Sequence, residues 1–350
     1  MKKFDEISFL NVLLCLLVIF IHVASEPVSA FAAGSLAHGL IFIPWRLAAF
    51  VVQGFIFLSG LKMFLNSGKK KNFSCKKYYA ARLKKIVLPY VIMVVVFYLY
   101  FVKEKYFGFS VSNLLGYIFK GDLCAHFYFV IAVIQFYALI PVWRWMIKSV
   151  KATVAIPAAL VITIVCGQYL PDLIRIVSGG YNFIYNDRIF TTYILYWVAG
   201  CYVGANYNSF RVIMLDKRVR LGAAVMFVVA AAADGGLSFI MAVKNIQIMQ
   251  LENLHIIYCI SAIVFFSTLA SMLGEKTMKN IIVRTIDKAS YYIYLIHPLV
   301  IFIVNSIIHK LGIMKVDIAF VIRTIVTYTV SVVLCGAYAE VKGKIISKRV

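Results

Sequence analysis

Ten apolar segments, each long enough to cross a bilayer, follow one another along the chain. A membrane-spanning helix needs about 17–25 mostly apolar residues. The segments cover roughly residues 7–25, 40–65, 86–102, 127–146, 152–169, 189–207, 221–243, 254–273, 290–309 and 318–339. Hydrophobic residues make up 63% of the 350, against about 45–50% in soluble proteins. We therefore predict a single all-α integral membrane domain over residues 1–350, with about ten transmembrane helices in a lipid bilayer.

Basic residues alternate between the connections that join these segments. The first connection, residues 25–39, contains no Lys or Arg, whereas the second contains eight and no acid: Lys69, Lys70, Lys71, Lys76, Lys77, Arg82, Lys84 and Lys85. The fourth, sixth and eighth connections and the C-terminal tail are also basic. The positive-inside rule then predicts both termini in the cytoplasm. The net charge of +22 is an orientation signal, and nucleic acid is not an expected partner.

His22 lies near the outer end of the first apolar segment, where few polar residues occur. Asn11 precedes it by eleven residues, so both side chains share one helical face about 16 Å apart along the axis. Glu26 follows at i+4 and extends this face if the helix persists, although Pro27 disfavours helical geometry there. Polar groups at membrane depth normally face the protein interior and mark functional sites.

Two polar features of the second and third segments each have two interpretations. Ser59-Gly60 permits close helix packing and also offers a hydroxyl, and Arg46 beside Trp45 is either functional or an interfacial anchor. The sequence Arg82-Leu-Lys-Lys85 at the start of the third segment suits phosphate groups of a nucleotide or coenzyme. An anchor for anionic lipids is the alternative for this basic run.

The fourth and sixth segments carry further polar residues at their ends. His126 is at the predicted depth of His22, while Gln135 is nine residues later and on the opposite face. Asp187-Arg188 precedes the sixth segment as a simple exposed ion pair or as a contact for acceptor hydroxyls.

Two basic residues late in the chain, and the cysteines, are less informative. A proline kink explains His297-Pro298 in the ninth segment, and we expect Arg323 in the tenth to face inward to a carboxylate that the sequence does not identify. The seven cysteines are scattered without a CxxC or Cys/His metal spacing. Neither a disulfide framework nor a metal site is predicted.

Taken in order, these motifs resemble the acyltransferase-3 family of integral membrane acyltransferases over nearly the whole chain. The similarity includes the first helix ending at His22, Phe57-Leu58-Ser59-Gly60, Arg82-Leu-Lys-Lys85 before Pro89, and His126-Phe-Tyr-Phe with Gln135-Phe-Tyr. It also includes Asp187-Arg188 and the run Ser290-Tyr-Tyr-Ile-Tyr-Leu-Ile-His-Pro. The branch that it most resembles is the one found with exopolysaccharide adhesin synthesis.

The resemblance implies transfer of an acyl group, commonly acetyl, from cytoplasmic acyl-CoA to a hydroxyl of a surface glycan or lipid-linked sugar. The expected location is the plasma membrane of a bacterium, and homo-oligomerisation is left open. Two positions depart from the family pattern. Asn11 stands where the family has an arginine, so a phosphate or carbonyl role for that arginine is in doubt here. Lys85 stands where a second arginine often occurs, and it keeps the charge without the bidentate fork.

The predicted mechanism assigns these residues to three roles. His22 is the general base for a sugar hydroxyl, with Glu26 orienting it; general-base help contributes about 10²–10⁴ in rate. The donor-binding residues are Arg82, Lys84, Lys85, Ser59 and Asn11. The acceptor-binding residues are Arg46, His126, Gln135, Asp187 and Arg188. No metal is expected.

Two other functions fit the same polar residues. A transporter or flippase for a polysaccharide or lipid-linked sugar would also need many helices and buried polar groups. The chain lacks a detectable pair of matching halves with broken helices, the usual indication of a transporter. The loss of arginine at Asn11 also permits a catalytically inactive scaffold or sensor.

Overall fold

The computed structural model describes residues 4–67, 73–248 and 250–347, and every regular element among them is helical. Lys69, Lys70 and Lys71 of the second connection lie outside the described residues. The chain forms two compact units, residues 1–54 with 211–350 and residues 55–210. α3 (Val51–Ser67) and α12 (Tyr207–Leu215) run across the boundaries between the units. The fold class is therefore all-α, as predicted.

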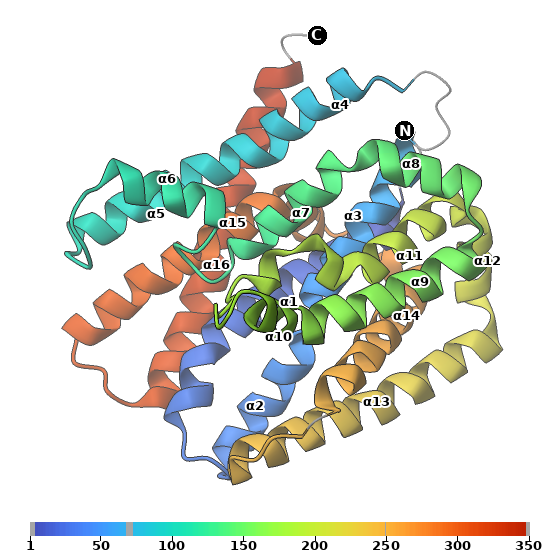
Figure 1. Ribbon diagram of the computed structural model, residues 1–350. Helices are drawn as coiled ribbons and strands as arrows, with labels where there is room; N and C mark the ends of the chain where they lie inside the picture. The colour runs from blue at the N-terminus through green and yellow to red at the C-terminus, as the bar shows by residue number, and fades with distance from the viewer. Residues whose placement is uncertain (1–3, 68–72, 249, 348–350) are drawn as a thin grey trace. The chain divides into compact units, whose positions relative to one another are not determined.

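The first unit is built mainly from long apolar helices. They are α1 (Asp5–Ala30), α2 (Leu36–Ala48), α13 (Lys217–Lys244), α14 (Leu251–Thr277), α15 (Ile281–Lys310) and α16 (Val316–Ser347). α1 packs against α2, α14, α15 and α16, which makes it the central helix of this unit. α15 and α16 form an antiparallel hairpin (Figure 1) around a core of Val300, Val304, Ile308 and Ala319.

Side chains cap the starts of α13 and α15 and satisfy their first backbone N–H groups. Asn280 Oδ1 accepts from the N–H groups of Ile282 and Val283 at the start of α15. Asp216 Oδ1 does the same for two N–H groups at the start of α13. Such caps stabilise a helix end by about 1 kcal/mol. They fix the points at which these helices begin.

α1 continues beyond Pro27, where the sequence made its end uncertain. The helix runs to Ala30, and the Phe31 N–H closes on the Pro27 carbonyl at 3.0 Å. Proline removes one backbone donor, but the segment keeps its helical path on both sides. Glu26 therefore remains one turn after His22 on the same face.

The second unit contains shorter and more interrupted helices. They are α4 (Cys75–Arg82), α5 (Leu88–Lys103), α6 (Val111–Lys120), α7 (Tyr128–Ala138), α8 (Ile140–Ser149), α9 (Ala152–Ile164), α10 (Leu170–Val177) and α11 (Ile194–Ala205). Two π turns, η1 (Leu83–Val87) and η2 (Val165–Tyr169), and two 3₁₀ turns, η3 (Asn186–Arg188) and η4 (Phe190–Tyr193), link some of them.

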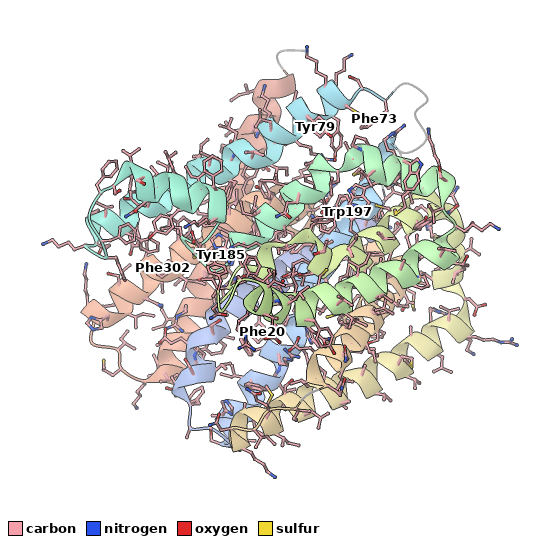
Figure 2. All side chains as sticks on the ribbon, in the orientation of Figure 1. Phe20, Phe73, Tyr79, Tyr185, Trp197 and Phe302 are labelled. Atoms are coloured by element: carbon pink, nitrogen blue, oxygen red, sulfur yellow. The ribbon has the colours of Figure 1, made fainter. Side chains whose placement is uncertain are left out.

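Glycines and a buried tryptophan hold α3 against α11 in the second unit. An added methyl group would collide with the Trp197 carbonyl at Gly60 and with the Phe57 carbonyl at Gly200. The close approach predicted at Ser59-Gly60 is thus found. Trp197, labelled in Figure 2, is fully buried and stacks on Phe136 with 4.6 Å between ring centroids.

Among the described residues, eight helical stretches are long and apolar enough to span a membrane. The pair α7 and α8, bent by 58°, makes up to nine. The predicted segment 189–207 differs, because η4 occupies its start and α11 has only 12 residues. Twelve residues rise about 18 Å, less than the roughly 30 Å of a hydrocarbon core. Placing both termini in the cytoplasm would require α11 to complete the tenth crossing, and this orientation stays a prediction.

Candidate active site

His22 faces a second histidine that sequence reasoning assigned only to a proline kink. The ring centroids of His22 and His297 are 5.0 Å apart, with the planes tilted by 52°. His297 is fully buried, and its Nδ1 lies 3.1 Å from the Ile293 carbonyl one turn earlier in α15. His22 is partly exposed, which distinguishes it from its fully buried partner. The pairing of His22 with His297 depends on how two separate helices pack, so the sequence does not predict it. The only sequence signal at His297 was the His-Pro pair itself.

A charged group lies one turn beyond this histidine pair. The Glu26 carboxylate accepts a hydrogen bond from Arg323 Nη2, so Glu26 is the carboxylate partner expected for Arg323. Arg323 Nε donates to Asn305 Oδ1 at 2.6 Å, and Asn305 Nδ2 donates to Glu26 at 3.4 Å. Three helices, α1, α15 and α16, thus meet through one set of polar side chains. The role predicted for Glu26, orienting His22, stays a prediction.

The contacts between these helices fix their relative direction. His22 pairs with His297 and Glu26 with Asn305, so residue numbers rise together along α1 and α15. Glu26 pairs with Arg323, whereas the Leu16 carbonyl accepts from the Tyr328 hydroxyl at 2.7 Å. α16 therefore runs antiparallel to α1, and the residues just after Arg323 lie level with His22.

Asn11 belongs to a separate polar cluster nearer the start of α1. Its Nδ2 donates to Asp287 Oδ1 and to Ser290 Oγ, both at 2.8 Å. Asn11 is buried, and the two partners are on α15. A guanidinium in place of this amide would face the same Asp287 carboxylate. Sequence reasoning singled out neither Asp287 nor the hydroxyl role of Ser290.

Arg46 is committed to a buried carboxylate. Its Nε and Nη2 donate to the two oxygens of Asp234 at 3.2 and 3.0 Å. His255 Nδ1 is 3.1 Å from the same carboxylate. Asp234, on α13, is fully buried. The arrangement ties α2, α13 and α14 together, and it engages the guanidinium that the sequence had suggested for acceptor binding.

Arg82, in the second unit, lines an apolar pocket. Its guanidinium carbon is 5.0 Å from the Tyr78 ring centroid and 4.5 Å from that of Tyr137. The pocket has a volume of about 370 Å³ and is lined by Tyr79, Ala80, Arg82, Leu83, Ile86, Val87, Ile134, Tyr137 and Ala138. Figure 2 labels Tyr79 on α4, whose hydroxyl donates to the Ala138 carbonyl at 2.8 Å. Cation–π contacts of this kind hold a guanidinium in place without neutralising it.

The other donor-binding candidates of this unit have less defined surroundings. Lys84 and Lys85 are exposed and lie in the π turn η1. α-Helical spacing would put Arg82 and Lys85 on one face, but a π turn is wider than an α-helical one, so that spacing does not hold across η1. Ser59 lies on α3 beside the Gly60 contact and is partly buried.

Gln135 fixes the loop that carries Asp187 and Arg188. Its Nε2 donates to the Arg188 carbonyl at 2.7 Å, and its Oε1 accepts from the Phe190 N–H at 3.2 Å. These bonds hold the backbone on both sides of Ile189, where the predicted sixth segment begins. They give Gln135 a structural role, whatever it also binds.

Asp187 and Arg188 form an ion pair with 2.9 Å between the Arg188 Nη1 and Asp187 Oδ1 atoms. Burial raises the pKa of the Asp187 carboxyl above its usual value, and the Arg188 charge opposes this rise. The guanidinium carbon of Arg188 lies 4.8 Å from the ring centroid of Tyr185, which is labelled in Figure 2. His126 is buried against Phe97, with 5.6 Å between ring centroids. The structure therefore groups Gln135, Asp187 and Arg188, while His126 lies in an aromatic environment.

Comparisons with known proteins give one family. No group of three or more His, Cys, Asp or Glu that could hold a metal ion occurs within residues 4–67, 73–248 and 250–347. Searches of curated proteins and of solved structures return no match. A family profile described as an acyltransferase domain matches residues 4–340, which include nearly all of both units and every site residue named above. The chain therefore belongs to the acyltransferase-3 family of membrane acyltransferases.

Proposed function

We propose that this membrane acyltransferase moves an acyl group, commonly acetyl, from acyl-CoA to a hydroxyl of a cell-surface glycan or lipid-linked sugar. The family supports acyl transfer in a membrane. The observation that carries the proposal further is the His22–His297 pair in the apolar interior of the first unit, with His22 the partly exposed member. An imidazole reachable by substrate, and backed by a second one, suits proton transfer.

The reaction needs a base because a sugar hydroxyl is a weak nucleophile at neutral pH. As the hydroxyl oxygen bonds to the thioester carbon, His22 accepts the hydroxyl proton. The carbonyl electron pair moves to oxygen, and it returns as the carbon–sulfur bond breaks. The CoA thiolate then takes the proton from His22. General-base assistance of this kind contributes about 10²–10⁴ in rate.

His297 acts as a positioning residue in this proposal. Its contact with the Ile293 carbonyl suits an Nδ1–H that donates there, which fixes the ring against α15. His22 packs on this fixed ring, so its own orientation is restricted. Restricting the base in this way reduces the entropy lost when the reacting geometry forms.

Donor binding by Arg82, Lys84 and Lys85 is a separate proposal about the second unit. Phosphates favour guanidinium and ammonium partners, and the cation–π contacts hold Arg82 in one orientation. A cytoplasmic position for these residues follows from the loop charges. In a bacterium, the protein would lie in the plasma membrane.

Acceptor binding is proposed for Asp187 and Arg188, with Arg46, His126 and Gln135 as further contacts. Hydroxyl groups bind well to paired charged side chains of this type. The Asp187–Arg188 pair supports the proposal because the Gln135 bonds hold its backbone in place. The contacts of Arg46 with Asp234 support an indirect role for Arg46.

The test uses the full chain purified into proteoliposomes with acetyl-CoA and an oligosaccharide acceptor. Release of free CoA thiol and the mass of the acceptor are measured together. We expect the wild type to add one acetyl group per CoA released and His22→Ala to fall by about 10²–10⁴. His309→Ala, which removes an exposed histidine in the last turn of α15, is the matched control and should retain activity.

Two outcomes would contradict the proposal. Normal acylation by the His22→Ala variant would exclude His22 as the base. Movement of the acceptor across the vesicle membrane without CoA release would favour a transporter instead.

A further inference from the structure

Two side chains next to the His22 level of α16 have buried polar atoms with no partner. Arg323 Nη1 and Thr327 Oγ1 have no hydrogen-bond partner and almost no accessible surface. Thr327 is 0% exposed and Arg323 is 2% exposed. Leaving a buried donor unsatisfied costs about 1–3 kcal/mol, and more when it is charged. Such groups are normally explained by a ligand or by water.

Two other hydroxyls in this unit are satisfied within their own helices, whereas Ser238 and Ser331 are buried and unpartnered like Thr327. Ser267 Oγ and Thr324 Oγ1 each donate to a carbonyl one turn earlier in their own helix, both at 2.7 Å. That bond is the usual way to satisfy a hydroxyl inside a membrane helix. Thr327 does not make it, although it is only three residues after Thr324. Its hydroxyl thus keeps its hydrogen-bonding capacity for another group.

The helix register brings both groups close to the level of His22. Arg323 binds Glu26, one turn above His22 on α1. Thr327 is one turn after Arg323 on the same face of α16. Because α16 runs antiparallel to α1 and Tyr328 bonds the Leu16 carbonyl, Thr327 lies between the levels of Glu26 and Leu16. His22 belongs to that interval.

We infer that Arg323 Nη1 and Thr327 Oγ1 are the hydrogen-bond donors that stabilise the oxyanion formed on the thioester carbonyl during acyl transfer. The inference rests on the proposed function. Attack by the sugar hydroxyl places a full negative charge on that oxygen, and a site with preorganised donors lowers the barrier to forming it. A guanidinium and a hydroxyl one helical turn apart supply one charged and one neutral donor.

Arg323 is already fixed in the orientation that this role requires. Its Nη2 binds Glu26 and its Nε donates to Asn305 Oδ1 at 2.6 Å. Two of the three guanidinium nitrogens are therefore anchored, and the third is left with its N–H groups unpaired. Donors that need no reorganisation during the reaction contribute most to catalysis.

Thr327→Val is the primary test because valine has the same shape and lacks the hydroxyl. Removing one oxyanion donor lowers kcat by about 10²–10³, and we expect that loss with the KM values for acetyl-CoA and acceptor changed less than twofold. Arg323→Lys keeps the charge and removes the fork, and it should lose at least tenfold in kcat.

Two variants of the same helix serve as controls. Thr324→Val removes a hydroxyl that is bonded to its own helix. Ser331→Ala removes a hydroxyl that is also fully buried and unpartnered, but one turn further from Arg323. Both should keep kcat within about twofold. Unfolding temperatures in detergent establish that every variant is folded.

The outcomes separate this inference from the proposed function. If His22→Ala is inactive but Thr327→Val keeps its kcat, the oxyanion role is wrong and the function stands. An equal loss in Thr327→Val and Ser331→Ala would indicate general packing or buried water, and it would also overturn the inference. If the wild type releases no CoA with any acceptor, the proposed function itself fails.

Discussion

Glu26 and Arg323 form an ion pair whose members differ in exposure: the Glu26 side chain is 50% exposed and that of Arg323 is 2% exposed. The two residues should therefore respond differently to truncation. Replacing Glu26 by Met leaves the buried Arg323 guanidinium with the Asn305 side chain as its remaining hydrogen-bond acceptor. Replacing Arg323 by Met leaves the Glu26 carboxylate, which is already half exposed. The same substitution removes the unpartnered Arg323 Nη1.

The magnitudes follow from this asymmetry. Removing one partner of a buried ion pair costs about 3–5 kcal/mol, and we take the lower end for Glu26→Met, about 3 kcal/mol, because Asn305 still accepts from Arg323. An exposed pair contributes only about 0–1 kcal/mol, so Arg323→Met should cost about 1 kcal/mol. The double variant should be more stable than Glu26→Met alone, because it no longer buries an uncompensated charge.

The assay is reversible unfolding of the purified protein in mixed micelles, followed by tryptophan fluorescence. Free energies of unfolding for the wild type, both single variants and the double variant give the coupling energy. A larger loss in Arg323→Met than in Glu26→Met would refute the reasoning. Equal losses in the two single variants would show that burial does not determine the cost.

The remaining predictions concern other contacts. Gly200→Ala should destabilise the protein by about 1–3 kcal/mol, because its methyl group would collide with the Phe57 carbonyl. Gly222→Ala has open space around it and should be neutral or slightly stabilising. Thermal unfolding in detergent compares the two variants. Asn11→Asp replaces the amide donor 2.8 Å from Asp287 Oδ1 by a second carboxylate, and it should cost about 2–3 kcal/mol at pH 8. Thermal unfolding in detergent measures this loss, and an unchanged stability would contradict the account.

Much of the fold could be predicted because membrane burial imposes a strong local pattern. Long apolar runs identify the helices in any tertiary arrangement. The segment 189–207 differed, since its composition is apolar but its beginning forms the 3₁₀ turn η4, and Gln135 bonds the Arg188 carbonyl and the Phe190 N–H there. The side chain that holds this backbone is more than fifty residues away in sequence.

The site was only partly predictable. His22, Asn11 and Glu26 could be found because a polar residue on an apolar helix stands out in one dimension. Their partners could not, since His297 looked like part of a proline kink and Asp287 like an ordinary residue near a helix start. The carboxylate expected for Arg323 is Glu26 on α1, almost three hundred residues earlier in the chain.

The sequence by itself determined that this chain is an all-helical membrane protein and which helix carries the histidine. It also determined the family, because the order of the motifs along nearly the whole chain can be read without knowing which residues are in contact. Only the tertiary structure decided which polar groups meet: His22 with His297, Glu26 with Arg323, and Thr327 with no partner of its own. The physical reason is that hydropathy is a property of each segment, whereas a hydrogen bond depends on the register between helices that packing alone sets.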